Sequence, residues 1–169
     1  MESKDPARPP VAAPAASPSA TDRIERSIDL RASRARAWQA LADAASFGTW
    51  FGADLAGQAF EPGRRARGRI THPGYGHLWF DVLVERVVPP DLLSFRWHPY
   101  AVDETIDHAR EQPTLVTFTL HDLPGGGTRL TVVESGFDAL PAHRRDEAFR
   151  MNGDGWTVQM DSVARHVDA

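Results

Sequence analysis

The chain contains no cysteine. Without a thiol it can form no disulfide, hold no iron–sulfur cluster or thiolate zinc site, and use no cysteine nucleophile. It also has no run of about 18 consecutive apolar residues, the length that predicts a membrane-spanning helix. Nor is there a basic excess, since 19 basic and 23 acidic residues give a formal net charge of −4. Nucleic acids and anionic membranes need basic patches, so we expect neither as a partner. The absence of cysteine fits a cytoplasmic protein, which is what we expect.

What the chain does contain fits one folded domain. Its 169 residues are 41% hydrophobic and 25% charged, close to the average for globular proteins. Residues 1–21 differ, because they hold five prolines and six alanines but a single large aliphatic residue, Val11. Such a segment buries too little apolar surface to offset its ordering entropy, and it lacks the apolar run of a signal peptide. We predict a disordered tail over 1–21 and one domain over 22–169.

Beyond residue 22 the hydrophobic pattern alternates between strand and helix. Period-two alternation predicts a first strand over 24–30. Ser33 is placed to cap a helix that carries Trp38, and a second short helix follows over 44–51. Five further strands are predicted, at 64–71, 78–88, 92–97, 114–123 and 128–135. The last element is a long helix over 142–167, whose apolar residues fall on one face.

This order of elements predicts an α+β fold. A run of strands joined by short turns forms an antiparallel sheet, and such a sheet has one apolar face that must be covered. The long final helix is the available cover. A curved sheet wrapped around a helix often leaves a cavity between the two, which is where we look for a site.

Several short motifs, taken in order, resemble a known superfamily. They are 33–41 with Trp38, Trp50-Phe51, Val87–Pro90 followed by Leu93–Trp97, Thr114–Leu120, Gly126–Gly136 and Gly155-Trp156. Over 23–167 the chain resembles the helix-grip superfamily (SRPBCC, START-like, polyketide-cyclase-like), and within it the group related to the activator of heat-shock protein 90 ATPase. The resemblance implies a curved antiparallel sheet of six to seven strands around a long C-terminal helix, with two short helices after the first strand. It also implies an apolar cavity, but no particular reaction.

Aromatic side chains at inward-facing positions are the main candidates for the wall of that cavity. They are Trp50, Phe80, Trp97, Phe118 and Trp156, joined by Met160 on the apolar face of the last helix. Small-molecule pockets combine aromatic walls with a few polar groups, so we predict that several of these residues line a ligand site. Trp97 and Trp156 are the first choice, because they lie on elements that flank the cavity in this fold. The alternative is that each is ordinary core.

Two charged residues fall on faces that should be apolar. Strand parity places Arg26 beside Ile24 and Ile28, and it places Glu134 beside Val132. The first and last strands are antiparallel neighbours in the helix-grip topology, so the two charges can meet. An unpaired buried charge costs several kcal/mol, which favours an ion pair. The pair is then either structural or a polar anchor for a ligand, unless the strand ends simply reach solvent.

The segment Trp97-His98-Pro99-Tyr100 begins a long loop that runs to Pro113. Loops of this length in compact domains are often functional. His98 and Tyr100 are therefore candidates to line or gate the mouth of the cavity, and a histidine can act as acid or base near neutral pH. The alternative is a surface histidine and a packing tyrosine.

The run Asn152-Gly153-Asp154-Gly155 is unusual inside a predicted helix, because each helical glycine costs roughly 1 kcal/mol relative to alanine. One interpretation is a kink or break, with the helix proper starting near Gly155. The other is that glycine removes bulk where the helix passes close to the sheet or to a ligand.

Metal and cofactor sites are not expected. His72 with His77, and Asp103 and Asp107 with His108, lie in predicted loops without a metal-ligand spacing. No serine–histidine–acid set can be argued from spacing, so no catalytic residue is assigned.

Three functions remain open. The leading hypothesis is a module that binds an apolar or aromatic small molecule in the cavity. The second is a cyclase- or hydrolase-type enzyme that uses the same cavity, with His98, Glu134 or Arg26 as acid or base. The third is a chaperone-associated interaction domain, which is not favoured because the sequence shows no distinctive recognition surface.

Overall fold

The computed structural model describes residues 17–169. Its elements are β1 (Arg23–Leu30), α1 (Arg34–Ala42), α2 (Ala44–Phe51), β2 (Arg65–Arg69), β3 (Trp79–Val88), β4 (Leu92–Trp97), β5 (Thr114–Asp122), β6 (Thr128–Ser135) and α3 (Ala142–Val167), with short 3-10 turns η1 (His108–Arg110) and η2 (Phe137–Ala139). The order and type of the helices and strands are those that the hydrophobic pattern predicts. The largest differences are at β2, which is shorter at both ends than expected.

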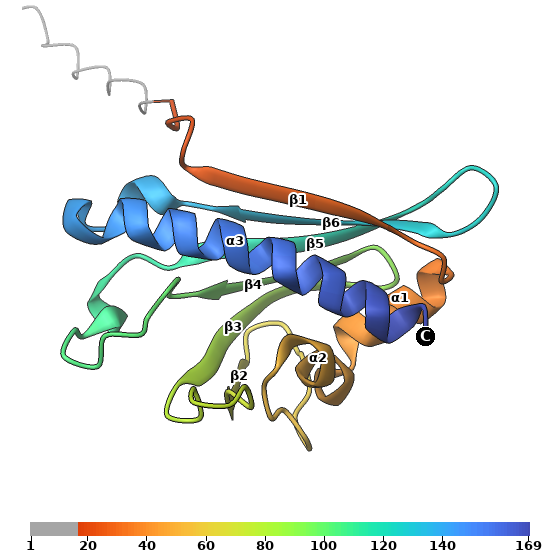
Figure 1. The fold of residues 1–169 in the computed structure, drawn as a ribbon, viewed down its shortest axis with the longest axis horizontal. Coiled ribbons are helices and arrows are strands. Elements are labelled where there is room, and N and C mark those ends of the chain that lie inside the picture. Colours follow the sequence, from red (N-terminus) through yellow and green to blue (C-terminus); the bar gives the residue numbers. More distant parts are fainter. Residues whose placement is uncertain (1–16) are drawn as a thin grey trace, which may run out of the picture.

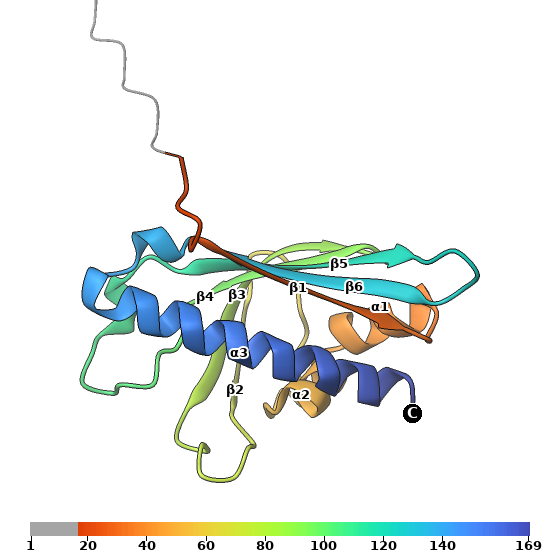
Figure 2. The same cartoon turned by 45° about the horizontal axis from the view of Figure 1, so that its top comes forward.

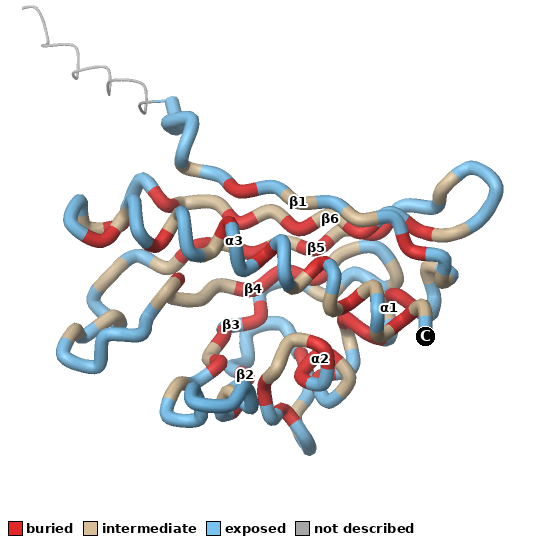
Figure 3. Tube along the Cα trace, viewed as in Figure 1, coloured by how far each residue is buried: buried red, intermediate tan, exposed pale blue. Residues whose placement is uncertain are grey.

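The six strands form one antiparallel sheet in the order β1-β6-β5-β4-β3-β2. The sheet curves over α3, and α1 and α2 lie near the C-terminal end of that helix (Figures 1 and 2). The predicted α+β helix-grip architecture is confirmed, including the antiparallel pairing of the first and last strands. Buried positions recur along the strands and along α3, where the two layers meet (Figure 3).

Local capping explains why two short helices follow β1. The hydroxyl of Ser33 accepts a hydrogen bond from the amide of Arg36, as its position predicts. Asp43 ends α1 and also begins α2, where its carboxylate accepts from the amide of Ser46 at 2.9 Å. Gly52 then closes α2 with a φ of +97°, a conformation that glycine adopts without steric cost.

Phenylalanine side chains fill the concave side of the sheet below α2. Phe47 is fully buried, and its ring centre lies 5.6 Å from Phe80, 6.2 Å from Phe95 and 5.9 Å from Phe118. Each buried phenyl ring contributes roughly 1.5–3 kcal/mol of hydrophobic stabilisation. These rings occupy much of the space between sheet and helices, so the hollows described below lie at the edge of this cluster.

The glycines in α3 do not break it. The helix runs without interruption from Ala142 to Val167, so the interpretation that it starts near Gly155 is wrong. A Cβ on Gly153 would lie 3.3 Å from Nη2 of Arg26, so this glycine leaves room for the Arg26 guanidinium against the helix. A Cβ on Gly155 would meet nothing within 4 Å.

Residues 1–16, which hold most of the predicted tail, lie outside the described part of the chain. The rest of that segment contacts the domain. Ser19 donates from its amide and hydroxyl to the carboxylate of Asp138, at 2.7 and 2.5 Å, and Thr21 accepts from Arg145 at 2.7 Å. Contacts with the domain therefore begin before residue 22.

Within residues 17–169, no helix has both the length and the apolar character needed to cross a membrane.

Candidate functional site

Glu134 is a fully buried carboxylate that is held by neutral donors. Its Oε2 accepts from the indole Nε1 of Trp97 and from the hydroxyl of Thr114, both at 2.6 Å. Its Oε1 accepts from the amide of Asn152 at 2.8 Å and from the indole Nε1 of Trp156 at 2.9 Å. Each oxygen thus accepts two hydrogen bonds, which suits an ionised carboxylate. These bonds replace the water that the group loses on burial.

Four elements bring these side chains together. Trp97 ends β4 and is paired in register with Thr114, the first residue of β5. Glu134 lies on the inward face of β6, opposite Val116 of β5. Asn152 and Trp156 are four residues apart on α3, so they lie on the same face of the helix.

The predicted ion pair between Arg26 and Glu134 is wrong. Parity places both residues on the helix-facing side, but Ile24 is opposite Glu134 in the register, whereas Arg26 is opposite Val132. The Arg26 guanidinium lies against α3 instead. It donates to the hydroxyl of Thr157 at 3.1 Å and to two backbone carbonyls, those of residues 25 and 153.

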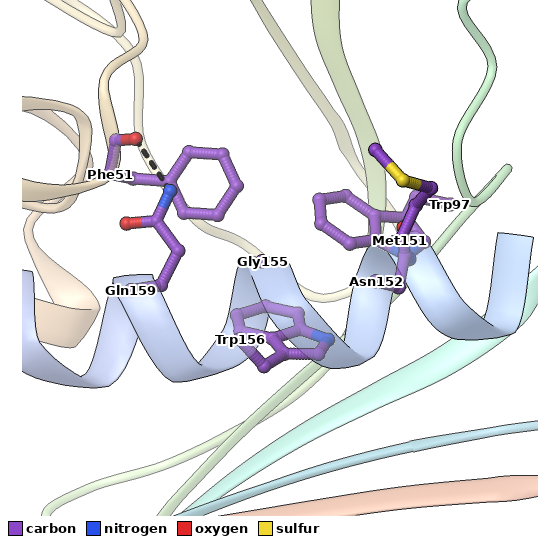
Figure 4. Close-up of a pocket in the computed structure, with 7 residues that line it drawn as sticks. All are labelled: Phe51, Trp97, Met151, Asn152, Gly155, Trp156 and Gln159. Carbon is purple, nitrogen blue, oxygen red and sulfur yellow. Dashed lines mark hydrogen bonds between the residues drawn. The ribbon is translucent and has the colours of Figure 1, made fainter.

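A hollow of about 160 Å³ opens beside the Glu134 network. Its lining residues, drawn in Figure 4, are Phe51, Trp97, Met151, Asn152, Gly155, Trp156 and Gln159. The rings of Trp97 and Trp156 are stacked, with centres 5.6 Å apart and planes 27° apart. Phe51 contacts both, with ring centres at 6.0 and 6.3 Å. Gly155 leaves the helix side of the hollow open, because it has no side chain.

A second hollow of about 190 Å³ adjoins the first and shares Phe51, Trp97 and Asn152 with it. Its other lining residues include Phe80, Asp81, Trp79, His98, Tyr100, Ala101 and Val102. The two hollows together form what we call the aromatic cleft. Each is smaller than the roughly 300 Å³ at which drug-sized pockets begin.

The structure brings some of the predicted cavity residues to this cleft and leaves others in the core. Those that line it are Phe80, Trp97, His98, Tyr100 and Trp156. Trp50, Phe118 and Met160 are buried core residues, and the Trp50 indole donates to the carbonyl of Ala40 at 2.8 Å. Glu134 lies behind the wall and bonds to three of its residues. Arg26 is not among the residues that line either hollow.

The sequence did not identify Phe51, Met151, Asn152 or Gln159 as lining residues, whereas Gly155 belongs to the glycine run for which closeness to a ligand was one interpretation. One signal for Asn152 was available, since it lies one helical turn before Trp156 on a helix that covers a sheet. Gln159 and Met151 carried no such signal, because polar and flexible side chains on a long helix look like solvent-facing positions.

Arg144 and Glu111 form a buried ion pair at the start of α3, with Nη2 and Oε2 2.7 Å apart and side chains only 8% and 6% exposed. Arg144 also donates to the carbonyls of Pro99 and Tyr100, both at 2.9 Å. The loop between β4 and β5 is therefore fixed to α3. Sequence reasoning did not find this pair, because Arg144 stands in a polar run that looks exposed.

His98 borders the cleft as a neutral imidazole. Burial lowers the pKa of His98 below 6.5; the negative charge of Glu111 opposes this shift, and the neighbouring His108 adds to it. Its Nδ1 has no hydrogen-bond partner among the described residues. In that part of the chain, no three histidine or acidic side chains converge as metal ligands.

Comparisons with known proteins agree with this architecture. The family model described as Activator of Hsp90 ATPase homolog 1-like protein matches residues 31–168. No protein of curated function matches the chain.

Three solved structures show the likeness in fold. DynU16, from the dynemicin biosynthetic locus, has a TM-score of 0.66 and 25% identity over 88% of this chain. This chain spans about half of DynU16, 48% of its length. Ms6760 from Mycobacterium smegmatis has a TM-score of 0.66 and 19% identity, covering 88% of this chain and 92% of that one. The Aha1 dimer from Colwellia psychrerythraea has a TM-score of 0.60 and 18% identity, covering 86% and 96%.

Proposed function

The chain belongs to the family of Activator of Hsp90 ATPase homolog 1-like proteins, and we propose that it is a small-molecule-binding protein whose site is the aromatic cleft. A fold of this kind commonly binds hydrophobic ligands, but fold alone does not assign a function. The proposal therefore depends on the cleft itself. We extend it to a cytoplasmic location, as the composition suggests.

The observation that carries the proposal is the way Glu134 holds the wall of the cleft. It accepts hydrogen bonds from both stacked indoles, Trp97 and Trp156, and from Asn152 between them. A fixed wall of this kind loses little rotamer entropy when a ligand binds. The same indoles in an ordinary core would not need a buried carboxylate, which costs free energy to desolvate.

The size of the cleft limits the ligand. An apolar cavity of about 150 Å³ admits a molecule the size of benzene, and the first hollow has about 160 Å³. The adjoining hollow of about 190 Å³ gives room for a second group of similar size. The ligand class is therefore a small molecule of one or two rings, or of equivalent aliphatic size.

Native mass spectrometry of protein purified from its own cell tests this proposal directly, because a copurified ligand appears as added mass. A titration with small neutral aromatic probes, such as indole, tests the site. Binding should shift the indole N–H NMR signals of Trp97 and Trp156 more than that of the core residue Trp50, which lines neither hollow.

A blocking variant and a matched control sharpen the titration. Gly155→Leu places a side chain in the first hollow and should abolish the shifts at both indoles. Val158→Leu introduces the same residue at an exposed position of α3 that does not line either hollow. Shifts that persist in Gly155→Leu, or that vanish in Val158→Leu, contradict the proposed site.

Catalysis in the same cleft is the second candidate, and one observation favours it. His98 lines the second hollow as a neutral imidazole with an unbonded Nδ1, which a general base requires. Glu134 is less suited to that role, because both of its oxygens already accept two hydrogen bonds. A turnover that Gly155→Leu and His98→Asn both abolish would support an enzyme.

A further inference from the structure

The nitrogen atoms around the first hollow already have acceptors within the protein. The indole nitrogens of Trp97 and Trp156 and the amide nitrogen of Asn152 all donate to Glu134. An anionic ligand needs hydrogen-bond donors or a positive charge. The side-chain donors of these three residues are therefore used by Glu134 and are not available to an anionic ligand.

The remaining amide shows the same arrangement. The side-chain nitrogen of Gln159 donates to the carbonyl of Phe51 at 2.9 Å (Figure 4). Within residues 17–169, the amide oxygens of Gln159 and Asn152 accept no hydrogen bond. Neither hollow has a lysine or arginine among its lining residues. The free polar atoms at the first hollow are therefore acceptors.

The charge behind the wall has the sign that matches these acceptors. Glu134 forms no salt bridge with any described residue, and Arg26 is committed to Thr157 and to backbone carbonyls. The hydrogen bonds that Glu134 accepts from the two indole N–H groups polarise Trp97 and Trp156, which increases the electron density on the ring faces. A cation over such a ring is attracted by this density, and more strongly when it is desolvated.

We propose that the aromatic cleft selects a positively charged ligand, a small quaternary or tertiary ammonium group that lies against Trp97, Trp156 and Phe51 with Glu134 as its buried counter-charge. This inference rests on the proposed function, since it names the ligand class of the same cleft. Asp81 lines the second hollow, but it is already paired with Arg65 at 2.6 Å and with Arg67 at 3.4 Å, so the counter-charge for the ligand is Glu134. The neutral His98 adds no opposing charge.

A pair of probes that differ only in charge tests the inference. Choline carries a trimethylammonium group, and 3,3-dimethylbutan-1-ol has the same shape with carbon in place of nitrogen. Each is titrated into the full chain while the indole N–H signals of Trp97 and Trp156 are followed by NMR. Choline should bind at least about tenfold more tightly than the neutral alcohol, the ratio that one desolvated cation–π contact supplies.

Charge variants at the rim provide a second readout that does not depend on altering the buried network. Met151 lines the first hollow and is 37% exposed on α3. Met151→Lys, Met151→Gln and Met151→Glu have unbranched side chains of similar length and similar helix propensity. The ratio of choline affinity to alcohol affinity should fall several-fold in Met151→Lys and rise in Met151→Glu, relative to Met151→Gln.

The outcomes separate this inference from the proposed function. If the neutral alcohol binds as tightly as choline, or the ratio does not follow the charge at residue 151, the cation inference is wrong and the binding site stands. If indole binds but neither choline nor the alcohol does, the inference is likewise overturned. If none of the three probes shifts the Trp97 and Trp156 signals, the cleft is not a ligand site and both proposals fail.

Discussion

Gly155 offers the sharpest test of the structure, because the same substitution should raise stability and remove binding. An ideal Cβ at this position meets nothing within 4 Å, and the residue lines the first hollow. Gly155→Ala is therefore free of steric cost. Gly155→Leu extends further into the same space, toward Phe51 and Trp97.

The expected change in the free energy of unfolding follows from helix propensity and from partial burial of the new side chain. Alanine is about 1 kcal/mol more favourable than glycine in a helix interior, and leucine is close to alanine. Burying part of the leucine side chain adds about 0.5–1 kcal/mol, at roughly 25 cal/mol per Å² of apolar surface. We expect Gly155→Ala to raise the free energy of unfolding by about 1 kcal/mol and Gly155→Leu by about 1–2 kcal/mol. For a domain of this size, each kcal/mol corresponds to about 2–4 °C in Tm.

Gly153 supplies the matched comparison on the same helix. Gly153→Ala gains the same propensity, but its Cβ lies 3.3 Å from Nη2 of Arg26. The guanidinium must then move, which weakens its bond to the carbonyl of residue 153. A hydrogen bond from a charged group is worth about 1.5–3 kcal/mol when fully formed. We expect the net gain to be close to zero.

Urea unfolding followed by tryptophan fluorescence measures all three variants, and the probe titration measures binding. Equal stabilisation by Gly153→Ala and Gly155→Ala would contradict the difference in free space between the two positions. A loss of more than about 1 kcal/mol in Gly155→Leu would show a clash in place of the expected gain.

Three further predictions concern the buried polar groups. Arg144→Ala leaves Glu111 buried without its partner, so urea unfolding should show a loss of about 3–5 kcal/mol, and a loss below 1 kcal/mol would contradict the buried pair. Glu134→Gln turns an amide NH₂ toward two of the four donors that Glu134 now binds. Because an unsatisfied donor costs about 1–3 kcal/mol, we expect the free energy of unfolding to fall by about 2–4 kcal/mol. An unchanged urea midpoint would refute the network. The pKa of His98 is lowered on folding, so the unfolded chain binds the proton more readily and stability should fall as the pH drops below 6.5. His98→Asn should flatten the dependence of the urea midpoint on pH between about 7.5 and 5.5. A slope equal to that of the parent protein would show that His98 is not buried.

The ion pair between Glu111 and Arg144, which fixes the loop that carries His98, also makes stability depend on pH at the acid end. Burial raises the pKa of Glu111, but the hydrogen bond and charge of Arg144 outweigh it, and the pKa lies below 4.5. The stability that this pair contributes is therefore present above 4.5 and is lost as the pH falls below that value. The two groups thus act in different pH windows.

Periodicity explains why much of the fold was predictable. Alternation along a strand and the 3.6-residue repeat of a helix are local properties, so they can be read without knowing any partner. They placed Glu134 on an inward face and identified α3 as the cover of the sheet. The resemblance to the helix-grip superfamily then added the order of the strands.

The partners of those side chains were not predictable in the same way. Parity assigns a face but not a neighbour, and Arg26 and Glu134 share a face without meeting. The residues that do bind Glu134 are 18 to 37 positions away along the chain. Only the register of β4, β5 and β6 and the position of α3 bring them together.

The sequence by itself determined the α+β class, the absence of thiol chemistry and the inward aromatic residues. The tertiary structure decided which of these aromatic residues line a hollow and which are buried in the core. Phe47 and its neighbours fill the concave side of the sheet, while Gly155 leaves the first hollow open. Whether a side chain lines a cleft or fills a core depends on what packs against it from distant elements, and no local pattern carries that information.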